Sequence, residues 1–209
     1  YADAYFHYAL LLVELNDIEE AKNNFDKVTE IDQNYAEGYY QKARLLSTPD
    51  DFEDARKNFE TAIDIRPDYI DGHYYMGKLL SGGVATSKEG SIIDRTDLPE
   101  AKKHFLRVLE LDKNHAKALY NLARLLSREE KYKQAHECLE KALQINPNYI
   151  EVHYGLACTS SLKNETAQAV EWLQKAIALD KSLIEKSKAE SAFDNIRESP
   201  EFQQLINSQ

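Results

Sequence analysis

Five aromatic residues recur along the chain at intervals of 34 or 46 residues, and a basic residue follows three of them four positions later. This spacing puts both side chains of a pair on one face of a helix. Such a pair offers apolar area, a hydroxyl group and a cation that binds carboxylates or backbone carbonyls. Tyrosine and arginine are also enriched at protein interfaces. The aromatic residues are Phe6, Tyr40, Tyr74, Tyr120 and Tyr154, and the basic residues are Arg44, Lys78 and Arg124.

The basic residues also have a purely structural interpretation. Each of them could pair with an acidic residue near the start of a neighbouring helix, namely Glu37, Asp71 or Glu151. Exposed ion pairs of this kind contribute only about 0–1 kcal/mol each. Three consecutive basic positions favour a ligand surface over a self-paired scaffold, and both interpretations stay open at this point.

Segment 36–69 indicates which elements would position these residues. Its apolar residues recur at i, i+4 and i+7 in two stretches, as in two amphipathic helices. Residues 48–51 (Thr-Pro-Asp-Asp) break the first helix and cap the second, and Pro67 ends the unit because proline cannot continue the helical hydrogen bonds. Neither helix can bury its apolar face alone, so we expect a stack of hairpins. The apolar residues are Tyr39, Ala43 and Leu46, then Ala55, Phe59 and Ala62.

The pattern recurs in five units, which are 2–35, 36–69, 70–115, 116–149 and 150–183. Small residues at the centre of each helix let neighbouring helices approach closely, and larger residues fill the space beside them. The small residues are Ala9, Ala21 and Val28; Ala43, Ala55 and Ala62; Gly77, Ala101 and Val108; Ala123, Ala135 and Ala142; Ala157, Ala169 and Ala176. The larger ones are Phe25, Phe59, Phe105, Leu139 and Leu173.

This 34-residue helix–turn–helix resembles the tetratricopeptide repeat (TPR) family. In the fourth unit the family positions are held by Leu119, Leu122, Ala123, Leu126, Ala135, Leu139, Ala142 and Pro147. The first-position Trp of the family is absent from every unit, and the terminating proline is present only as Pro67 and Pro147. The resemblance implies an all-α fold, namely a right-handed α-solenoid of five TPR hairpins over residues 1–183.

The resemblance also implies that the first helices line a concave groove, where ligands of this family usually lie. The residues expected to bind a peptide there are Tyr40, Arg44, Tyr74, Lys78, Lys117, Tyr120, Asn121, Arg124 and Tyr154. Members of the family that clamp the C-terminal carboxylate of chaperones use a set of Lys, Asn and Arg residues. The closest window here has Tyr40 and Arg44, then Tyr75, then Lys117 and Asn121. Most of that set is missing, so a chaperone clamp is not expected.

Two segments depart from the repeat. The third unit, 70–115, carries 12 extra residues between its helices; Gly82 and Gly83 should end the first helix and residues 97–100 should start the second. We expect a solvent-exposed loop over 81–96, with Ile92 and Ile93 as an alternative docking hook. Residues 184–209 predict capping helices at the C-terminal end, one over 184–190 and one after Ser199, because a solenoid needs a polar terminal cap.

Composition and motifs narrow the functional classes. The net charge of −10 argues against nucleic acid as a partner, and the absence of an apolar run of about 20 residues argues against membrane insertion of these residues. Cys138 and Cys158 are too few for a disulfide framework or a zinc site and are compatible with a reducing, cytoplasmic compartment. Because the first residue is Tyr, a targeting sequence upstream would not be visible. No catalytic or phosphate-binding motif occurs, so we expect no enzyme activity, cofactor or metal.

The sequence therefore predicts a protein–protein interaction module. Its concave groove would bind an acidic or aromatic-anchored segment of a partner protein, with a preorganised surface that limits the entropy cost to the ligand. The alternative is a structural segment of a longer repeat array, or a self-associating scaffold without its own peptide ligand.

Overall fold

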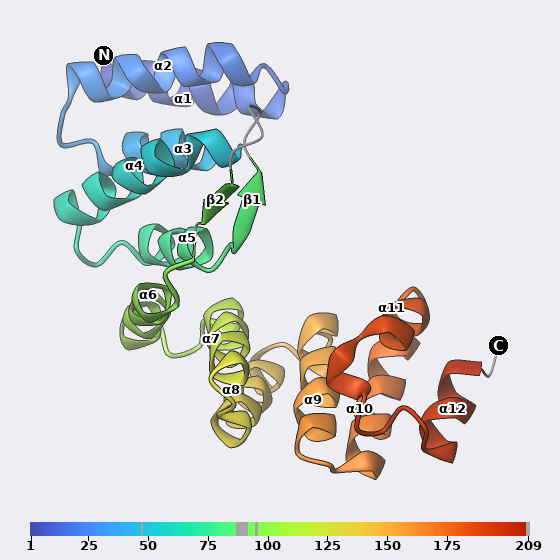
Figure 1. Ribbon diagram of the computed structural model, residues 1–209. Coiled ribbons are helices and arrows are strands. Elements are labelled where there is room, and N and C mark those ends of the chain that lie inside the picture. Colours follow the sequence, from blue (N-terminus) through green and yellow to red (C-terminus); the bar gives the residue numbers. More distant parts are fainter. Residues whose placement is uncertain (47, 87–91, 95, 208–209) are drawn as a thin grey trace. The chain divides into compact units, whose positions relative to one another are not determined.

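The computed structural model describes residues 1–46, 48–86, 92–94 and 96–207, and for 84–86 and 92–93 only the backbone. The chain divides into two compact units, 1–111 (the N-terminal unit) and 112–209 (the C-terminal unit), which are described separately. The predicted all-α fold of five helical hairpins with C-terminal capping helices is confirmed (Figure 1). The boundary at 183/184 between the array and the cap stays a prediction. No described helix has the length and apolar character needed to cross a membrane.

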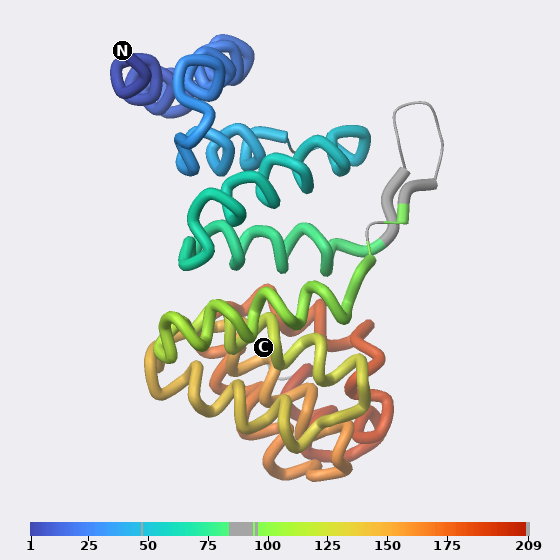
Figure 2. Tube along the Cα trace, turned by 90° about the vertical axis from the view of Figure 1, so that its left-hand side faces the viewer, coloured from blue at the N-terminus to red at the C-terminus, as the bar shows by residue number. Residues whose placement is uncertain are grey.

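The N-terminal unit contains three hairpins. They are α1 (Ala2–Glu14) with α2 (Ile18–Ile31), α3 (Ala36–Leu45) with α4 (Phe52–Ile65), and α5 (Ile70–Leu80) with α6 (Leu98–Leu111). The α1–α2 hairpin lies at one end of this unit, followed by α3, α4 and α5 (Figure 2). The predicted break at 48–51 is a 3₁₀ turn (Pro49–Asp51) in which the Asp51 carboxylate accepts hydrogen bonds from the backbone N–H and the hydroxyl of Thr48.

Small residues allow the helices of a hairpin to pack closely. At Gly77 in α5, a Cβ atom would lie only 2.9–3.1 Å from three ring carbons of Phe105 in α6. The Phe105 side chain is fully buried, as is Phe25, which packs beside Ala9 in the first hairpin. This packing confirms the predicted pairing of small and large positions, because a side chain at Gly77 would have to displace the ring.

The insertion in the third unit is not simply a loop. Strands β1 (Val84–Thr86) and β2 (Ile92–Asp94) pair antiparallel, with Ala85 opposite Ile93. The segment predicted as a loop over 81–96 therefore contains two short paired strands, which were not predicted from the sequence. The predicted helix ends around them are confirmed: α5 stops at Leu80, Gly83 has a positive φ of 75°, and Asp97 Oδ1 accepts a hydrogen bond from the Glu100 N–H at 3.1 Å. The docking role suggested for Ile92 and Ile93 lies outside the described side chains.

The C-terminal unit contains two hairpins and the cap. The hairpins are α7 (Ala116–Arg128) with α8 (Tyr132–Ile145) and α9 (Ile150–Leu162) with α10 (Thr166–Leu179). The cap consists of α11 (Leu183–Ala189), a 3₁₀ turn (Ser191–Phe193) and α12 (Pro200–Asn207). The two predicted capping helices are therefore present. The buried side chains of the cap include Phe193, Ile196, Phe202 and Ile206, which share one core with α9 and α10.

A buried histidine, His73, meets a partly buried one, His104, in the N-terminal unit. His73 Nε2 lies 3.1 Å from the carbonyl oxygen of Pro67, and its Nδ1 lies 2.9 Å from Nδ1 of His104. A carbonyl only accepts, so His73 donates through Nε2 and its Nδ1 accepts from the Nδ1–H of His104. Burial and the charge of the neighbouring ring lower the pKa of His104 to about 4, and burial also lowers the pKa of His73. Both rings are therefore neutral at pH 7.

Acid is expected to weaken this unit. In the unfolded chain both histidines have a pKa near 6.5, so the unfolded state binds more protons than the folded state from about pH 6.5 down to about pH 4. The free energy of unfolding therefore falls as the pH falls through this window. Urea unfolding between pH 7 and pH 5 should show this slope in the wild type and a flatter slope in His104→Asn. His7→Asn, at an exposed position, is the control. An equal flattening in both variants would contradict a role for the His73–His104 pair.

Candidate functional site

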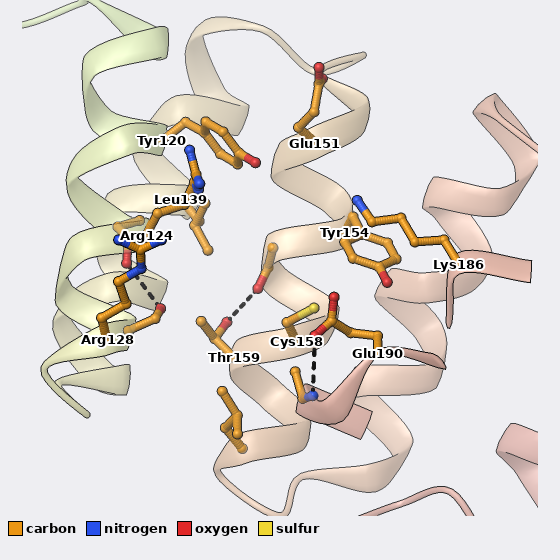
Figure 3. Close-up of a pocket in the computed structure, with 15 residues that line it drawn as sticks. Tyr120, Arg124, Arg128, Leu139, Glu151, Tyr154, Cys158, Thr159, Lys186 and Glu190 are labelled. Atoms are coloured by element: carbon orange, nitrogen blue, oxygen red, sulfur yellow. Dashed lines mark hydrogen bonds between the residues drawn. The ribbon is translucent and has the colours of Figure 1, made fainter. Parts of the chain in front are cut away.

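The C-terminal unit has a cavity of about 370 Å³ between α7, α9 and the cap. Three of the predicted site residues line it, Tyr120 and Arg124 from α7 and Tyr154 from α9 (Figure 3). The cap contributes Lys186 and Glu190 to the opposite wall. A neighbouring hollow of about 350 Å³ shares four residues with this cavity, namely Tyr120, Glu151, Tyr154 and Lys186.

The floor of the cavity is aromatic and neutral. Tyr154 is only 7% exposed, and its ring packs edge-on against Phe193 at 5.7 Å while the Lys186 ammonium lies 4.5 Å from the ring centre. Burial raises the pKa of Tyr154 and of Tyr120, so both phenols keep their protons at neutral pH. Burial also raises the pKa of the Cys158 thiol, which makes it a poor nucleophile. These two phenols and this thiol are therefore all in their neutral, protonated forms at neutral pH.

The rim of the cavity carries both signs of charge, with Arg124, Arg128 and Lys186 against Glu151 and Glu190. The Arg124 guanidinium donates a hydrogen bond to Asn121 Oδ1 at 3.3 Å. Among the described residues no ion pair joins Arg124 or Lys186 to a carboxylate. These two cations can therefore bind a ligand carboxylate without first breaking a salt bridge.

The cap positions the wall that faces α7 and α9. Its buried residue Phe193 packs on Tyr154 and Phe202, and the Arg197 guanidinium donates to the carbonyl oxygen of Glu190 at 2.9 Å. The Glu190 carboxylate accepts a hydrogen bond from the Ala192 N–H at 3.4 Å. Our sequence reasoning treated this segment only as a polar end and missed Lys186 and Glu190, because neither belongs to a repeating position.

The N-terminal unit brings two of the predicted basic residues to one tyrosine. The Arg44 guanidinium and the Lys78 ammonium each lie 5.3 Å from the centre of the Tyr75 ring. These three residues border a hollow of about 220 Å³. The predicted ring Tyr40 is only 5% exposed and packs on Tyr75 at 5.7 Å. Sequence reasoning left Tyr75 out of the site, although it follows the predicted Tyr74 directly.

The remaining predicted residues are placed differently. Tyr74 is 8% exposed and packs on Phe105. Lys117 is exposed and lines neither cavity of the C-terminal unit. Asn121 is buried and donates to the carbonyl oxygen of Lys117 at 2.8 Å. A ligand-binding role for these residues stays a prediction, and the buried Tyr40 and Tyr74 offer a ligand much less area than an exposed ring would.

The self-paired interpretation does not hold for Glu37 and Arg44, because each of them has a different partner. Glu37 pairs with Arg66, with 2.5 Å between the carboxylate oxygen and the guanidinium nitrogen. Arg44 instead donates to the side-chain oxygen of Gln41 at 3.0 Å.

In the described part of the chain, no cluster of three His, Cys, Asp or Glu residues could hold a metal ion.

The chain is similar to known repeat proteins. Family models described as tetratricopeptide repeat match residues 2–35, 36–69, 116–149 and 150–183, which together are more than half of the chain. No curated protein matches the chain.

Solved structures share the fold. The structure of YrrB, described as a TPR protein with an unusual peptide-binding site, is 24% identical with a TM-score of 0.69. The match covers 90% of this chain and 92% of the YrrB chain. MamA from Desulfovibrio magneticus RS-1 is 22% identical with a TM-score of 0.71, over 87% and 96% of the two chains. PilF of Pseudomonas aeruginosa is 20% identical with a TM-score of 0.67, over 100% and 97%. With the repeats matched in sequence and the hairpins present in the structure, the chain belongs to the tetratricopeptide repeat family.

Proposed function

We propose that this protein is a non-enzymatic interaction module that binds an acidic, aromatic-anchored segment of a partner protein in the cavity of the C-terminal unit. The observation that carries the proposal is the convergence of Tyr120, Arg124, Tyr154 and Lys186 on one open cavity. The TPR fold supports a protein-interaction role in general, and YrrB is a relative in fold that is described as having a peptide-binding site.

The chemistry of the lining selects the ligand. Arg124 and Lys186 would bind a carboxylate side chain, and the Tyr120 ring, which is partly exposed, would stack on an apolar or aromatic side chain next to it. Glu151 and Glu190 on the rim would repel a second acid and attract a basic residue or a backbone N–H group. A segment with one acid beside an aromatic residue fits this distribution better than a uniformly acidic one.

The proposal predicts loss of binding in Arg124→Glu/Lys186→Glu. Reversing two charges that face a ligand carboxylate should weaken binding of a partner segment by a factor of about 100 or more, because each unpaired or opposed charge costs about 2 kcal/mol or more. For an isolated peptide we expect wild-type affinity near 1 μM, about −8 kcal/mol. The test is quantitative affinity capture from source-cell lysate, followed by titration of a peptide from the captured protein.

The matched control is Lys133→Glu/Lys141→Glu, which changes the net charge equally at exposed positions of α8. Circular dichroism must show unchanged helicity in both variants. A partner captured by the wild type and the control but not by the cavity variant would support the proposal. Equal capture by all three would show that the cavity is not the binding site and would favour the Arg44–Tyr75–Lys78 surface of the N-terminal unit.

A further inference from the structure

One side of α1 carries a cluster of exposed apolar side chains. Tyr8, Leu11 and Leu15 expose 50%, 49% and 69% of their surface, and Ala4 is also exposed. Ala4, Tyr8 and Leu11 lie in α1, and Leu15 directly follows its last residue; their spacing of three or four residues puts them on one side of the helix. We call Ala4, Tyr8, Leu11 and Leu15 the α1 face. Exposed apolar patches of this kind mark interaction surfaces more often than single exposed residues do.

The corresponding face of later first helices is covered. In the N-terminal unit α2 packs on α3 and α4 packs on α5, and in the C-terminal unit α8 packs on α9. The third position, held by Ala4 in α1, is Gly38 in α3. A Cβ atom at Gly38 would lie 2.9 Å from Val28 Cγ1 of α2. At the equivalent Gly72 of α5 a Cβ atom would lie 3.2 Å from Ile63 Cγ1 of α4.

The seventh and tenth positions of the repeat unit, held by Tyr8 and Leu11 in α1, are also covered in later first helices. Tyr8 corresponds to Met76 in α5 and to Leu156 in α9, which are 1% and 0% exposed. Leu11 corresponds to Thr159 in α9, whose hydroxyl lies 3.3 Å from Nδ1 of His136 in α8. Each covered example is thus a first helix that receives the second helix of the preceding hairpin.

We propose that the α1 face binds the second helix of another tetratricopeptide hairpin. The kind of helix follows from the seventh position. In α3 this position is Lys42, whose ammonium lies 2.5 Å from the Asp26 carboxylate of α2. Tyr8 is not a cation, so it could not pair with the acid that an α2-like helix has at the position of Asp26.

A helix that resembles α4 fits better. In α4 the position of Asp26 is held by Glu60, which already pairs with Arg56 of the same helix at 2.9 Å. The seventh position of α5, on which α4 packs, is the apolar Met76, which is 1% exposed, and Tyr8 holds the same position in α1. The expected partner helix is therefore amphipathic, with an aliphatic residue at the place of Ile63 and an acid that pairs within its own helix.

A second copy of this chain fits the α1 face poorly. The helix holds 13 residues, so one face is about 20 Å long and offers little area for a symmetric dimer. It contains Asp3 and Glu14 but no Lys or Arg. Pairing two α1 faces in either direction would bring acids of one copy close to acids of the other.

The test places an α4-like helix beside the α1 face. Residues 36–69 are duplicated directly before Ala2, in place of Tyr1, so that a second α4 precedes α1 as α4 precedes α5. We expect the Tm of the N-terminal unit to rise by several degrees and hydrogen exchange of the α1 amides to slow. Tyr8→Asp/Leu11→Asp should abolish both gains in the fused chain. The same pair should change the Tm of the unfused chain much less, because both side chains are half exposed there.

The charge-matched control is Asn23→Asp/Gln33→Asp, at exposed positions outside α1, and it should keep the gain. A fused chain with no rise in Tm, or with a rise that survives Tyr8→Asp/Leu11→Asp, would overturn the proposal. Light scattering of the unfused chain tests whether a second copy of the chain occupies the α1 face. A mass that doubles with concentration and returns to that of a monomer in Tyr8→Asp/Leu11→Asp would assign the face to a second copy and would also overturn the proposal.

Discussion

Phe193→Ala is expected to destabilise the C-terminal unit by about 3–5 kcal/mol. Phe193 is fully buried, and its ring contacts Tyr154 of α9 and Phe202 of α12. Removing a buried ring of this size costs the lost transfer free energy together with the energy of the cavity that remains. Because the cap has few residues and depends on this ring for its contact with α9, we expect it to detach before the hairpins unfold.

Detachment of the cap has a consequence for the cavity. Lys186 and Glu190 belong to the cap, whereas Tyr120 and Arg124 belong to α7. Phe193→Ala should therefore raise hydrogen exchange over 183–207 and weaken partner binding, although it replaces no charged residue. Urea unfolding and exchange measured by mass spectrometry check both parts.

Leu179→Ala is the control for Phe193→Ala, since Leu179 is 44% exposed in α10 and its removal should cost much less. If Phe193→Ala left the unfolding midpoint and the exchange of 183–207 unchanged, the cap would not depend on this ring. If the cap detached while partner binding stayed at the wild-type level, Lys186 would have no part in the binding site.

The hairpins could be predicted because each depends on local signals that repeat. Helix spacing, the Thr48–Asp51 cap and the Asp97 cap all lie within a few residues of the elements they define. The two paired strands have a weaker signal: two runs of three residues, each containing two β-branched residues, separated by five residues. An insertion between the helices of a repeat usually indicates a loop, and so short a strand pattern does not outweigh that expectation.

The helix face on which the site residues lie could be predicted from the sequence, but the burial of each side chain could not. The i, i+4 rule places Tyr40 and Arg44 on one helix face, but how far a ring is buried depends on the second helix that packs over it. Tyr40 contacts Phe59 of α4 and Tyr69 of the next turn, and these contacts make it mostly a core residue. The contribution of Lys186 comes from a segment outside the repeats, for which periodicity carries no information.

The second prediction with a large effect concerns the pair Gly77 and Phe105. Phe105→Ala should destabilise the N-terminal unit by about 3–5 kcal/mol, because the ring is fully buried and packs on Tyr74 and Gly77. Gly77→Val should cost about 1–3 kcal/mol, because even a Cβ atom would lie within 3.1 Å of the ring and the branched side chain adds further overlap. Each loss is measured by urea unfolding.

The double variant separates close packing from a general requirement for these residues. In Gly77→Val/Phe105→Ala the valine enters space that the ring has left, so the combined loss should be smaller than the sum of the single losses by about 1 kcal/mol or more. Gly155→Val with Phe105→Ala is the additive control, since Gly155 lies in the C-terminal unit and faces Leu139. Additive losses in the Gly77 pair would mean that glycine is needed there for a reason other than the ring, and the close approach of α5 and α6 would then not depend on the size of these two side chains.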